Sequence, residues 1–143
     1  GKCMEIIANA LQTVQANQNV YFSDTVVSGG TAISHRDDSG LITLRGNTGQ
    51  CRARFRVTFG GNIAVPATGG TVGPISLAIA IEGEAIQSTN MIVTPAAVEE
   101  FFNVFAAIFI DVPRGCCFTI SVHNTSDEAI EVQNANLIVE RVA

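Results

Sequence analysis

Apolar and polar residues alternate along most of this chain, with the period of two that is typical of β-strands. The clearest case is 51–59, Cys-Arg-Ala-Arg-Phe-Arg-Val-Thr-Phe, in which every second residue is apolar. Because successive side chains on a strand point to opposite faces, this pattern predicts a strand with one face in a core. Residues 75–81 alternate large aliphatic and small side chains. They predict a second strand that packs a core with one face and lies close against another part of the protein with the other face.

Turn residues separate further strand segments. Residues 82–84, Glu-Gly-Glu, have the composition of a hairpin turn. Residues 105–112 are apolar almost throughout, which predicts a strand buried on both faces and ended by Pro113-Arg114-Gly115. About ten short strands joined by Gly, Pro and Asn turns indicate an all-β protein, a β-sandwich of the jelly-roll type.

Two segments allow more than one interpretation. Residues 4–14 place apolar side chains on one face at helical spacing, so they form either a helix or a strand that leads into the sheet. Residues 94–100, Thr-Pro-Ala-Ala-Val-Glu-Glu, form either one turn of helix or a loop. We therefore predict a lead-in segment at 1–16 and a single jelly-roll domain at 17–143.

Composition predicts self-association. Hydrophobic residues make up 47% of the chain and charged residues only 15%, whereas an average soluble domain has roughly 25% charged residues. Such a surface is short of groups that keep a monomer in solution, so we expect area to be buried between subunits. A formal charge of −5 argues against nucleic acid as a partner.

The longest apolar run, at 101–110, is too short to cross a bilayer, so no membrane insertion is expected. The first residues, Gly-Lys-Cys-Met-Glu, show no secretory signal or myristoylation pattern. Asn124-Thr125-Ser126 matches the N-glycosylation motif, which matters only in a secretory host.

Residues with catalytic or metal-binding chemistry are sparse. His35-Arg36-Asp37-Asp38 places an imidazole beside two carboxylates, but Asp-Asp-Ser-Gly is ordinary turn composition. His123 has no second histidine at ligand spacing, and no Gly-x-Ser-x-Gly nucleophile motif occurs. We therefore expect no enzyme activity, no metal site and no cofactor.

The four cysteines, Cys3, Cys51, Cys116 and Cys117, show neither a disulfide framework nor metal-ligand spacing. Cysteine is among the most frequently buried residue types. We expect them to be small buried hydrophobic residues, with at most one of the adjacent pair facing the core.

Arg52, Arg54 and Arg56 form the most distinctive polar feature. On one face of a strand their guanidinium groups lie about 7 Å apart. Like charges in a row are unfavourable unless acids or an anionic ligand neutralise them. The row therefore indicates either an ion-pair ladder with Asp or Glu of neighbouring strands, or recognition of an anion such as an acidic glycan.

The closing residues 134–143, Asn-Ala-Asn-Leu-Ile-Val-Glu-Arg-Val-Ala, resemble the last strand of the C1q/TNF-like domains that end bacterial collagen-like exosporium glycoproteins. Residues 75–81 before a short Gly hairpin fit the same family. The stretch 17–143 also resembles uncharacterised proteins of gut Firmicutes and their phages, which share the Val-Pro…Gly-Gly-Thr-Val-Gly-Pro-Ile-Ser region. No collagen-like Gly-X-Y stalk is present.

The resemblance implies a ten-stranded jelly roll that forms a tight homotrimer through one sheet face and caps a stalk, fibre or particle at a cell, spore or virion surface. It implies no catalytic site. The chain has more phenylalanines than a single core of this size needs on one side. We therefore expect some of six at the subunit contact: Phe55, Phe59, Phe101, Phe102, Phe105 and Phe109.

Two functions follow from these observations. The first is a structural protein, a trimeric surface or virion component whose role is assembly. The second is a trimeric binding module that holds a receptor or glycan with its loops or with the Arg52, Arg54 and Arg56 face. The chain has one tyrosine and no tryptophan, so the aromatic platform that usually binds sugars is thin, which favours assembly.

Overall fold

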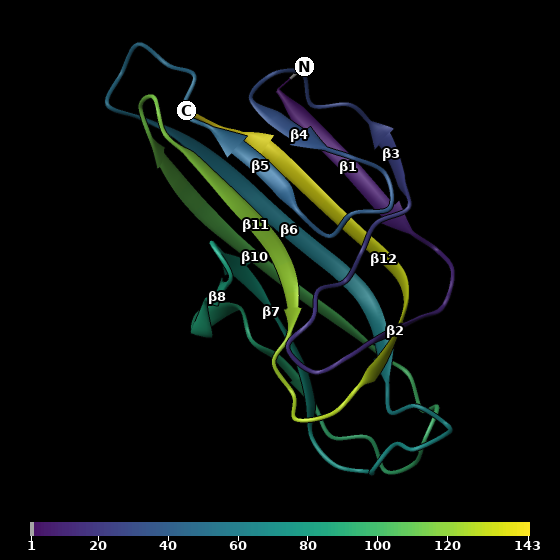
Figure 1. Cartoon of the computed structure of the whole chain (residues 1–143). Coiled ribbons are helices and arrows are strands. Elements are labelled where there is room, and N and C mark those ends of the chain that lie inside the picture. Colours follow the sequence, from purple (N-terminus) through teal and green to yellow (C-terminus); the bar gives the residue numbers. More distant parts are fainter. Residues whose placement is uncertain (1) are drawn as a thin grey trace.

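A computed structural model describes residues 2–143, which form twelve strands and one short 3-10 helix. The strands pack as two antiparallel sheets (Figure 1). In chain order the elements are β1 (Cys3–Ala8), β2 (Gln12–Val14), β3 (Asp24–Val27), β4 (Ile33–His35), β5 (Ile42–Arg45), β6 (Arg52–Ala64), β7 (Ile75–Ile81), β8 (Glu84–Ala85), η1 (Gln87–Thr89), β9 (Met91–Val93), β10 (Phe102–Pro113), β11 (Cys117–Asn124) and β12 (Ile130–Arg141).

Sheet A has the strand order β10-β6-β12-β1-β3, and β2 also pairs with β12. Its long strands β6, β10 and β12 run side by side along the molecule (Figure 1). Sheet B has the order β4-β5-β11-β7-β8, and β9 also pairs with β7. Neighbours in each sheet come from distant parts of the chain, which is the crossing pattern of a jelly roll. The predicted all-β jelly-roll sandwich is confirmed.

The core lies between the sheets and is filled by alternate residues of both. Phe22, Phe55 and Phe59 are the largest side chains in it and are fully buried. The rings of Phe22 and Phe59 meet edge to face, with their centroids 6.5 Å apart. Period-two alternation in the sequence therefore translates directly into an inner and an outer face for each long strand.

The segment 4–14 is strand, not helix. Met4, Ile6 and Ala8 alternate into the core, and β1 pairs with β12 on one side and β3 on the other. Because a central place in a sheet satisfies the backbone and buries these side chains, it overrides the helical spacing. The expected lead-in segment 1–16 therefore contributes β1 and β2 to sheet A, while Gly1 lies outside the described residues.

Two further segments, a loop and a hairpin, can be compared with what the sequence predicted for them. Residues 94–101 form an irregular loop, which settles the choice left open between helix and loop. The hairpin at 82–83 is confirmed: Glu82 and Gly83 both have positive φ, 54° and 80°, and join β7 to β8. This pair of left-handed residues is the geometry that matches the twist of a two-residue hairpin. No helix within 2–143 is long and apolar enough to cross a membrane.

Candidate functional site

The outer face of sheet A, which points away from the core, carries apolar and small side chains. On β10, Phe105 and Phe109 are 65% and 59% exposed. Phe105 lies opposite Gly60 of β6, where no side chain covers the sheet. The adjoining row runs from Thr58 of β6 to Ile138 of β12. We call this region the apolar face: Phe105, Ala107 and Phe109 of β10, Thr58 and Gly60 of β6, Ile138 of β12 and Ile7 of β1.

The prediction that β10 is buried on both faces is wrong for the single chain. Val104, Ile110 and Val112 point into the core, but Phe105 and Phe109 between them point outward and are exposed. A strand that is apolar on both faces requires a cover on each. Here the sandwich supplies one cover, and no other part of residues 2–143 covers Phe105 and Phe109.

The six phenylalanine candidates fall into three groups. Phe55 and Phe59 are 0% exposed inside the sandwich, so the expectation that they serve a subunit contact is wrong. They lie at alternate positions of β6 with Ala53 and Val57, so all four side chains point into the core. Phe101 and Phe102 are partly exposed where β10 begins, and Phe105 and Phe109 form the apolar face. The alternation at 51–59 already places Phe55 and Phe59 on the core side, whereas the run at 105–112 is apolar almost throughout and does not show which of its side chains point outward.

The apolar face continues around the edge of the sandwich. There, β9 and β10 border a hollow of about 310 Å³ lined by residues 88–93 and 103–107. Ile92 of β9 is 61% exposed beside it, and Phe105 also lines it. We call Ile92, Phe105 and this hollow the apolar edge. Ile92 lies in the short apolar run 91–93, and a run of three residues does not show in the sequence which side chain is exposed.

The arginine row lies at one end of the same outer face, and all three arginines have acidic partners. Arg54 donates two hydrogen bonds to Asp111, with Nε–Oδ1 2.8 Å and Nη2–Oδ2 3.1 Å. Nε of Arg52 lies 3.5 Å from the second oxygen of Asp111. Nη2 of Arg56 lies 3.2 Å from Glu140 Oε1. Because β6 is flanked by β10 and β12, each acid comes from a neighbouring strand in register.

These pairs shift two pKa values in opposite directions. The hydrogen bonds from Arg54 lower the pKa of Asp111, and the charge of Arg52 lowers it further. The hydrogen bonds to Asp111 and its charge raise the pKa of Arg54. Both groups are therefore held in their charged forms. Three guanidinium groups face two carboxylates, so the row keeps an excess positive charge.

An asparagine row crosses the opposite end of the same face. Asn103 of β10 donates to Asn62 Oδ1 of β6 at 3.0 Å, and Asn62 donates to Asn134 of β12 at 3.4 Å. Asn134 has a φ of 55° and marks a register shift in β12. The outer face of sheet A is thus polar at both ends and apolar along the middle of β10, while Asn136 of β12, opposite Gly60, donates to Glu5 of β1 at 2.5 Å.

The two histidines have structural partners. His35 Nδ1 lies 3.0 Å from Thr25 Oγ1, and Nε2 lies 2.9 Å from the carbonyl of Ser39. The ring of His35 also packs edge to face on Phe22. His123 Nδ1 lies 2.9 Å from Asn19 Oδ1. Neither imidazole touches a carboxylate and a nucleophile together, which is the arrangement that general-base catalysis requires.

Asn124 of the glycosylation motif is fully buried. Its Nδ2 donates to the carbonyls of Val14 at 3.0 Å and Glu128 at 2.9 Å, and its Oδ1 accepts from Ser126. A glycan cannot reach this amide in the folded chain. Asn124 instead ties the end of β11 in sheet B to β2 in sheet A.

The expectation that the cysteines are buried is wrong. Cys3, Cys51, Cys116 and Cys117 are all exposed and free. Each lies at a strand end or in a turn, where the two sheets do not cover its side chain. No group of three or more His, Cys, Asp or Glu side chains within 2–143 is placed to hold a metal ion.

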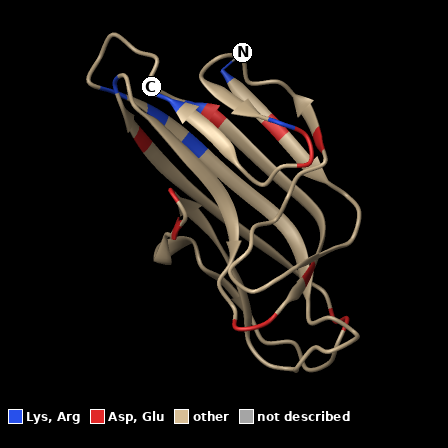
Figure 2. Ribbon diagram, in the orientation of Figure 1, with Lys and Arg blue, Asp and Glu red and all other residues tan. Residues whose placement is uncertain are grey.

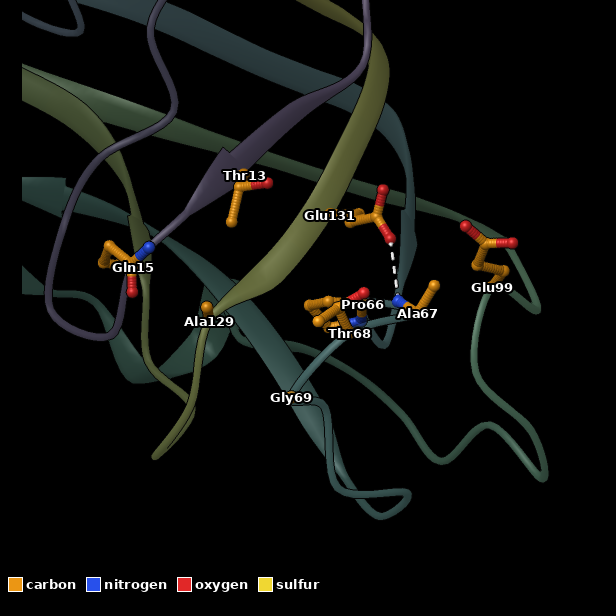
Figure 3. A pocket seen from close by; sticks show the side chains of 9 residues that line it. All are labelled: Thr13, Gln15, Pro66, Ala67, Thr68, Gly69, Glu99, Ala129 and Glu131. Atoms are coloured by element: carbon orange, nitrogen blue, oxygen red, sulfur yellow. Dashed lines mark hydrogen bonds between the residues drawn. The ribbon is translucent and has the colours of Figure 1, made fainter.

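A hollow of about 440 Å³ lies at the far end of the molecule, away from the termini (Figure 3). Two acids, Glu99 and Glu131, border it. Glu131 accepts a hydrogen bond from the amide of Ala67 at 3.3 Å. No lysine, arginine, histidine or cysteine lines it. It therefore offers carboxylates without a partner for acid–base or nucleophilic chemistry.

Basic and acidic side chains are distributed unevenly along the long axis of the molecule. Figure 2 shows lysine and arginine gathered in the half that carries both termini, whereas the opposite end shows acidic residues only. Arg54 and Arg114 belong to the first half, and Glu99 and Glu131 to the second. Such a dipole orients a molecule relative to charged partners more than it stabilises the fold.

No protein-family model matches this sequence, and no curated protein matches it. Solved structures do match by shape. The globular domain of zebrafish complement 1qA has 9% identity and a TM-score of 0.69, covering 100% of this chain and 98% of that one. The Eiger TNF structure from S. frugiperda has 12% identity and a TM-score of 0.71, covering 99% and 92%.

Murine APRIL has 9% identity and a TM-score of 0.62, covering 96% of this chain and 97% of that one. Identities this low establish the fold alone, since one fold serves many functions. The fold that residues 2–143 adopt is the C1q/TNF-like jelly roll.

Proposed function

We propose that this protein is a non-enzymatic structural protein that assembles into a homotrimer through sheet A. The observation that carries the proposal is the exposure of Phe105 and Phe109 on the outer face of a sheet. Contiguous exposed apolar surface on a well-packed domain marks an interaction site, because removing such surface from water lowers the free energy. The low content of charged residues points the same way.

The shape of the apolar surface favours a ring. The apolar edge presents Ile92 and Phe105 beside a hollow, whereas Gly60 leaves β6 without a side chain at the middle of the apolar face. An edge of one subunit that packs on the face of the next uses two different surfaces, which is a heterologous contact. Heterologous contacts close into cyclic rings, and three subunits is the number that the C1q/TNF-like resemblance implies.

We further propose that the trimer is a component of a cell, spore or virion surface. Both termini lie at the same end of the sandwich (Figure 1). A stalk or particle joined there would leave the loops around residues 65–74 and 94–101 facing outward. The resemblance to bacterial exosporium and phage surface proteins supports this role.

Light scattering behind size exclusion tests the assembly. The expected mass is that of three chains at every protein concentration. Phe105→Ser together with Phe109→Ser should reduce it to one chain, because both replace exposed rings at the contact with polar groups. Leu41→Ser is the matched control, since Leu41 is 52% exposed but directly precedes β5 of sheet B. A single-chain mass for the unmodified protein would refute the proposal.

Recognition of an acidic glycan by the arginine row is a second candidate. It is favoured by one observation: Arg52 and Arg54 share Asp111, so one positive charge is left without its own carboxylate. An exposed guanidinium suits the carboxylates or sulfates of such a glycan. A glycan array that compares the unmodified protein with Arg54→Ala, and with Arg36→Ala as a control, tests glycan recognition against assembly alone. Binding that only Arg54→Ala removes supports recognition, and no binding by the unmodified protein eliminates it.

A further inference from the structure

Two cationic side chains occupy positions at which the alternation of sheet A would place core residues. Met4 of β1 lies opposite Val139 of β12, and both are buried between the sheets. Two positions further along the same strands, Lys2 lies opposite Arg141, and the amide of Arg141 donates to the carbonyl of Lys2 at 2.7 Å. Because side chains alternate along a strand, both cations belong to the core side of sheet A, beyond the last core residues.

A hollow of about 270 Å³ adjoins these two cations, and both line it. Its other lining residues are 30–32, between β3 and β4, and Asn47, between β5 and β6. Both of these connections cross from one sheet to the other, so the hollow lies at an end of the sandwich. Thr31 adds a hydroxyl and Asn47 a side-chain amide, both of which can donate hydrogen bonds. We call Lys2, Arg141 and this hollow the basic mouth.

The guanidinium group of Arg141 is held in a fixed orientation. Its Nε donates to the main-chain oxygen of Ala143 at 3.2 Å, and its Nη1 donates to the carbonyl of Asn47 at 2.6 Å. Within residues 2–143, Nη2 of this guanidinium makes no hydrogen bond. The group is therefore positioned in advance and keeps donors for a ligand.

The two cations of the basic mouth have no acidic side chain as partner among the residues described. The ion pairs found there belong instead to Arg52, Arg54 and Arg56. Like charges directly opposite on neighbouring strands are unfavourable, and a charge removed from water is costly unless it is paired. An anion in the hollow would remove both penalties at once.

We propose that the basic mouth binds a phosphate or sulfate group. Two cations that reach one hollow from different strands suit a doubly charged anion, and the fork of a guanidinium matches the oxygens of a tetrahedral oxyanion. The arginine row differs, because Asp111 and Glu140 already engage its guanidinium groups. The basic mouth lies away from the outer face of sheet A, so the inference does not depend on the proposed trimer.

Calorimetric titration of the full chain with inorganic phosphate tests the site, near neutral pH and with the ionic strength held constant by sodium chloride. We expect saturable binding by the unmodified protein. Lys2→Gln together with Arg141→Gln should weaken it about 10-fold or more, because charge-assisted hydrogen bonds are lost. Arg36→Gln removes one exposed positive charge outside the mouth and is the control, with an expected change of less than about 2-fold.

The same titration with glycerol phosphate identifies the source of the anion. Tighter binding of glycerol phosphate than of inorganic phosphate would indicate a phosphate group carried by a larger molecule. Tighter binding of inorganic phosphate would indicate the free ion. Both results require the basic mouth, so the double variant should weaken either ligand to the same extent.

Thermal unfolding of Lys2→Gln alone guards against a folding defect in the double variant. The side chain of Lys2 is exposed and forms no ion pair within residues 2–143. In chloride, Lys2→Gln should unfold at the same temperature as the unmodified protein or at a higher one, because one of two like charges is gone. Phosphate should raise the unfolding temperature of the unmodified protein more than that of Lys2→Gln.

Four results would overturn the proposal. The first is no binding of phosphate by the unmodified protein, and the second is binding that the double variant retains. The third is binding that Arg52→Gln removes, which would place the anion on the arginine row. The fourth is a lower unfolding temperature for Lys2→Gln in chloride, which would mean that the charge of Lys2 is already neutralised.

Discussion

The outer faces of the two sheets differ in what they expose. Sheet A presents Phe105 and Phe109, whereas the corresponding face of sheet B carries the half-buried Thr43 and Thr119 on β5 and β11. Beside them, Ser121 of β11 and Ala78 and Ala80 of β7 are buried. Among the residues that the structure describes, the large exposed apolar side chains on strands belong to β3, β9 and β10. β3 and β10 are edge strands of sheet A, and β9 lies beside β10 at the apolar edge.

The difference shows that a core alone does not account for this sequence. A sandwich needs one apolar face on each sheet, and both sheets supply it. The second face is free to be polar, as on sheet B. An apolar second face lowers solubility unless another surface covers it, so its presence on one sheet indicates the side on which this protein meets a partner.

The largest expected effect contrasts the two sides of sheet A. Phe59→Ala removes a fully buried ring and should lower the free energy of unfolding by about 3–5 kcal/mol. Phe105→Ala should leave that free energy nearly unchanged when the subunits are dissociated, because its ring is exposed in the single chain. Urea unfolding in dilute solution measures both. Equal losses would mean that Phe105 is packed within its own chain.

The next effect concerns how the two sheets are held together. Asn124→Ala leaves the carbonyls of Val14 and Glu128 and the amide of Ser126 without their partner. Unpaired buried polar groups cost about 1–3 kcal/mol, and we expect a loss in that range. Thermal unfolding of Asn124→Ala beside Thr125→Ala, its partly buried neighbour, checks this. A smaller loss for Asn124→Ala than for the control would contradict the assigned role.

Two adjacent glycines sharpen the comparison further. A Cβ at Gly61 would lie 3.1 Å from Phe59 Cζ inside the sandwich, whereas a Cβ at Gly60 meets only the carbonyl of Val104 at 3.9 Å. Gly61→Val should therefore destabilise the fold by about 1–3 kcal/mol through overpacking. Gly60→Val should keep the fold but obstruct the flat apolar face. Unfolding curves together with light scattering separate the two effects, and an intact trimer with Gly60→Val would contradict the proposed contact.

The smallest effect tests the polar end of sheet A. Because the pKa of Asp111 is lowered in the folded protein, its ion pairs contribute stability above the carboxyl's unfolded pKa. That contribution is lost as the pH falls through the folded pKa, which means below about pH 4. Arg54 stays protonated throughout this range, since its pKa is raised.

Thermal unfolding from pH 7 to pH 2 should show Asp111→Asn less stable than the unmodified protein at neutral pH, with the difference shrinking in acid. Asp127→Asn carries the same change of charge at an exposed turn and serves as the control. A difference for Asp111→Asn that does not change with pH would contradict this origin.

The sequence by itself predicted the jelly roll, the alternation on β6, the hairpin at 82–83 and an ion-pair partner for the arginines as one of two options. These follow from local rules: strand period, turn composition and the cost of unpaired charge. The composition also indicated more apolar residues than one core needs, but it does not show where those residues lie.

Only the tertiary structure decided which surface is in excess. Alternation marks Phe59 as a core residue, but Phe105 lies in an apolar run without alternation, so only the pairing of β6 with β10 and the packing of the sheets show that its ring lies outside. The same register put β1 inside sheet A and left the cysteines uncovered at the ends of strands. Where the sequence does not alternate, burial depends on neighbours that are distant along the chain, so the local pattern does not specify it.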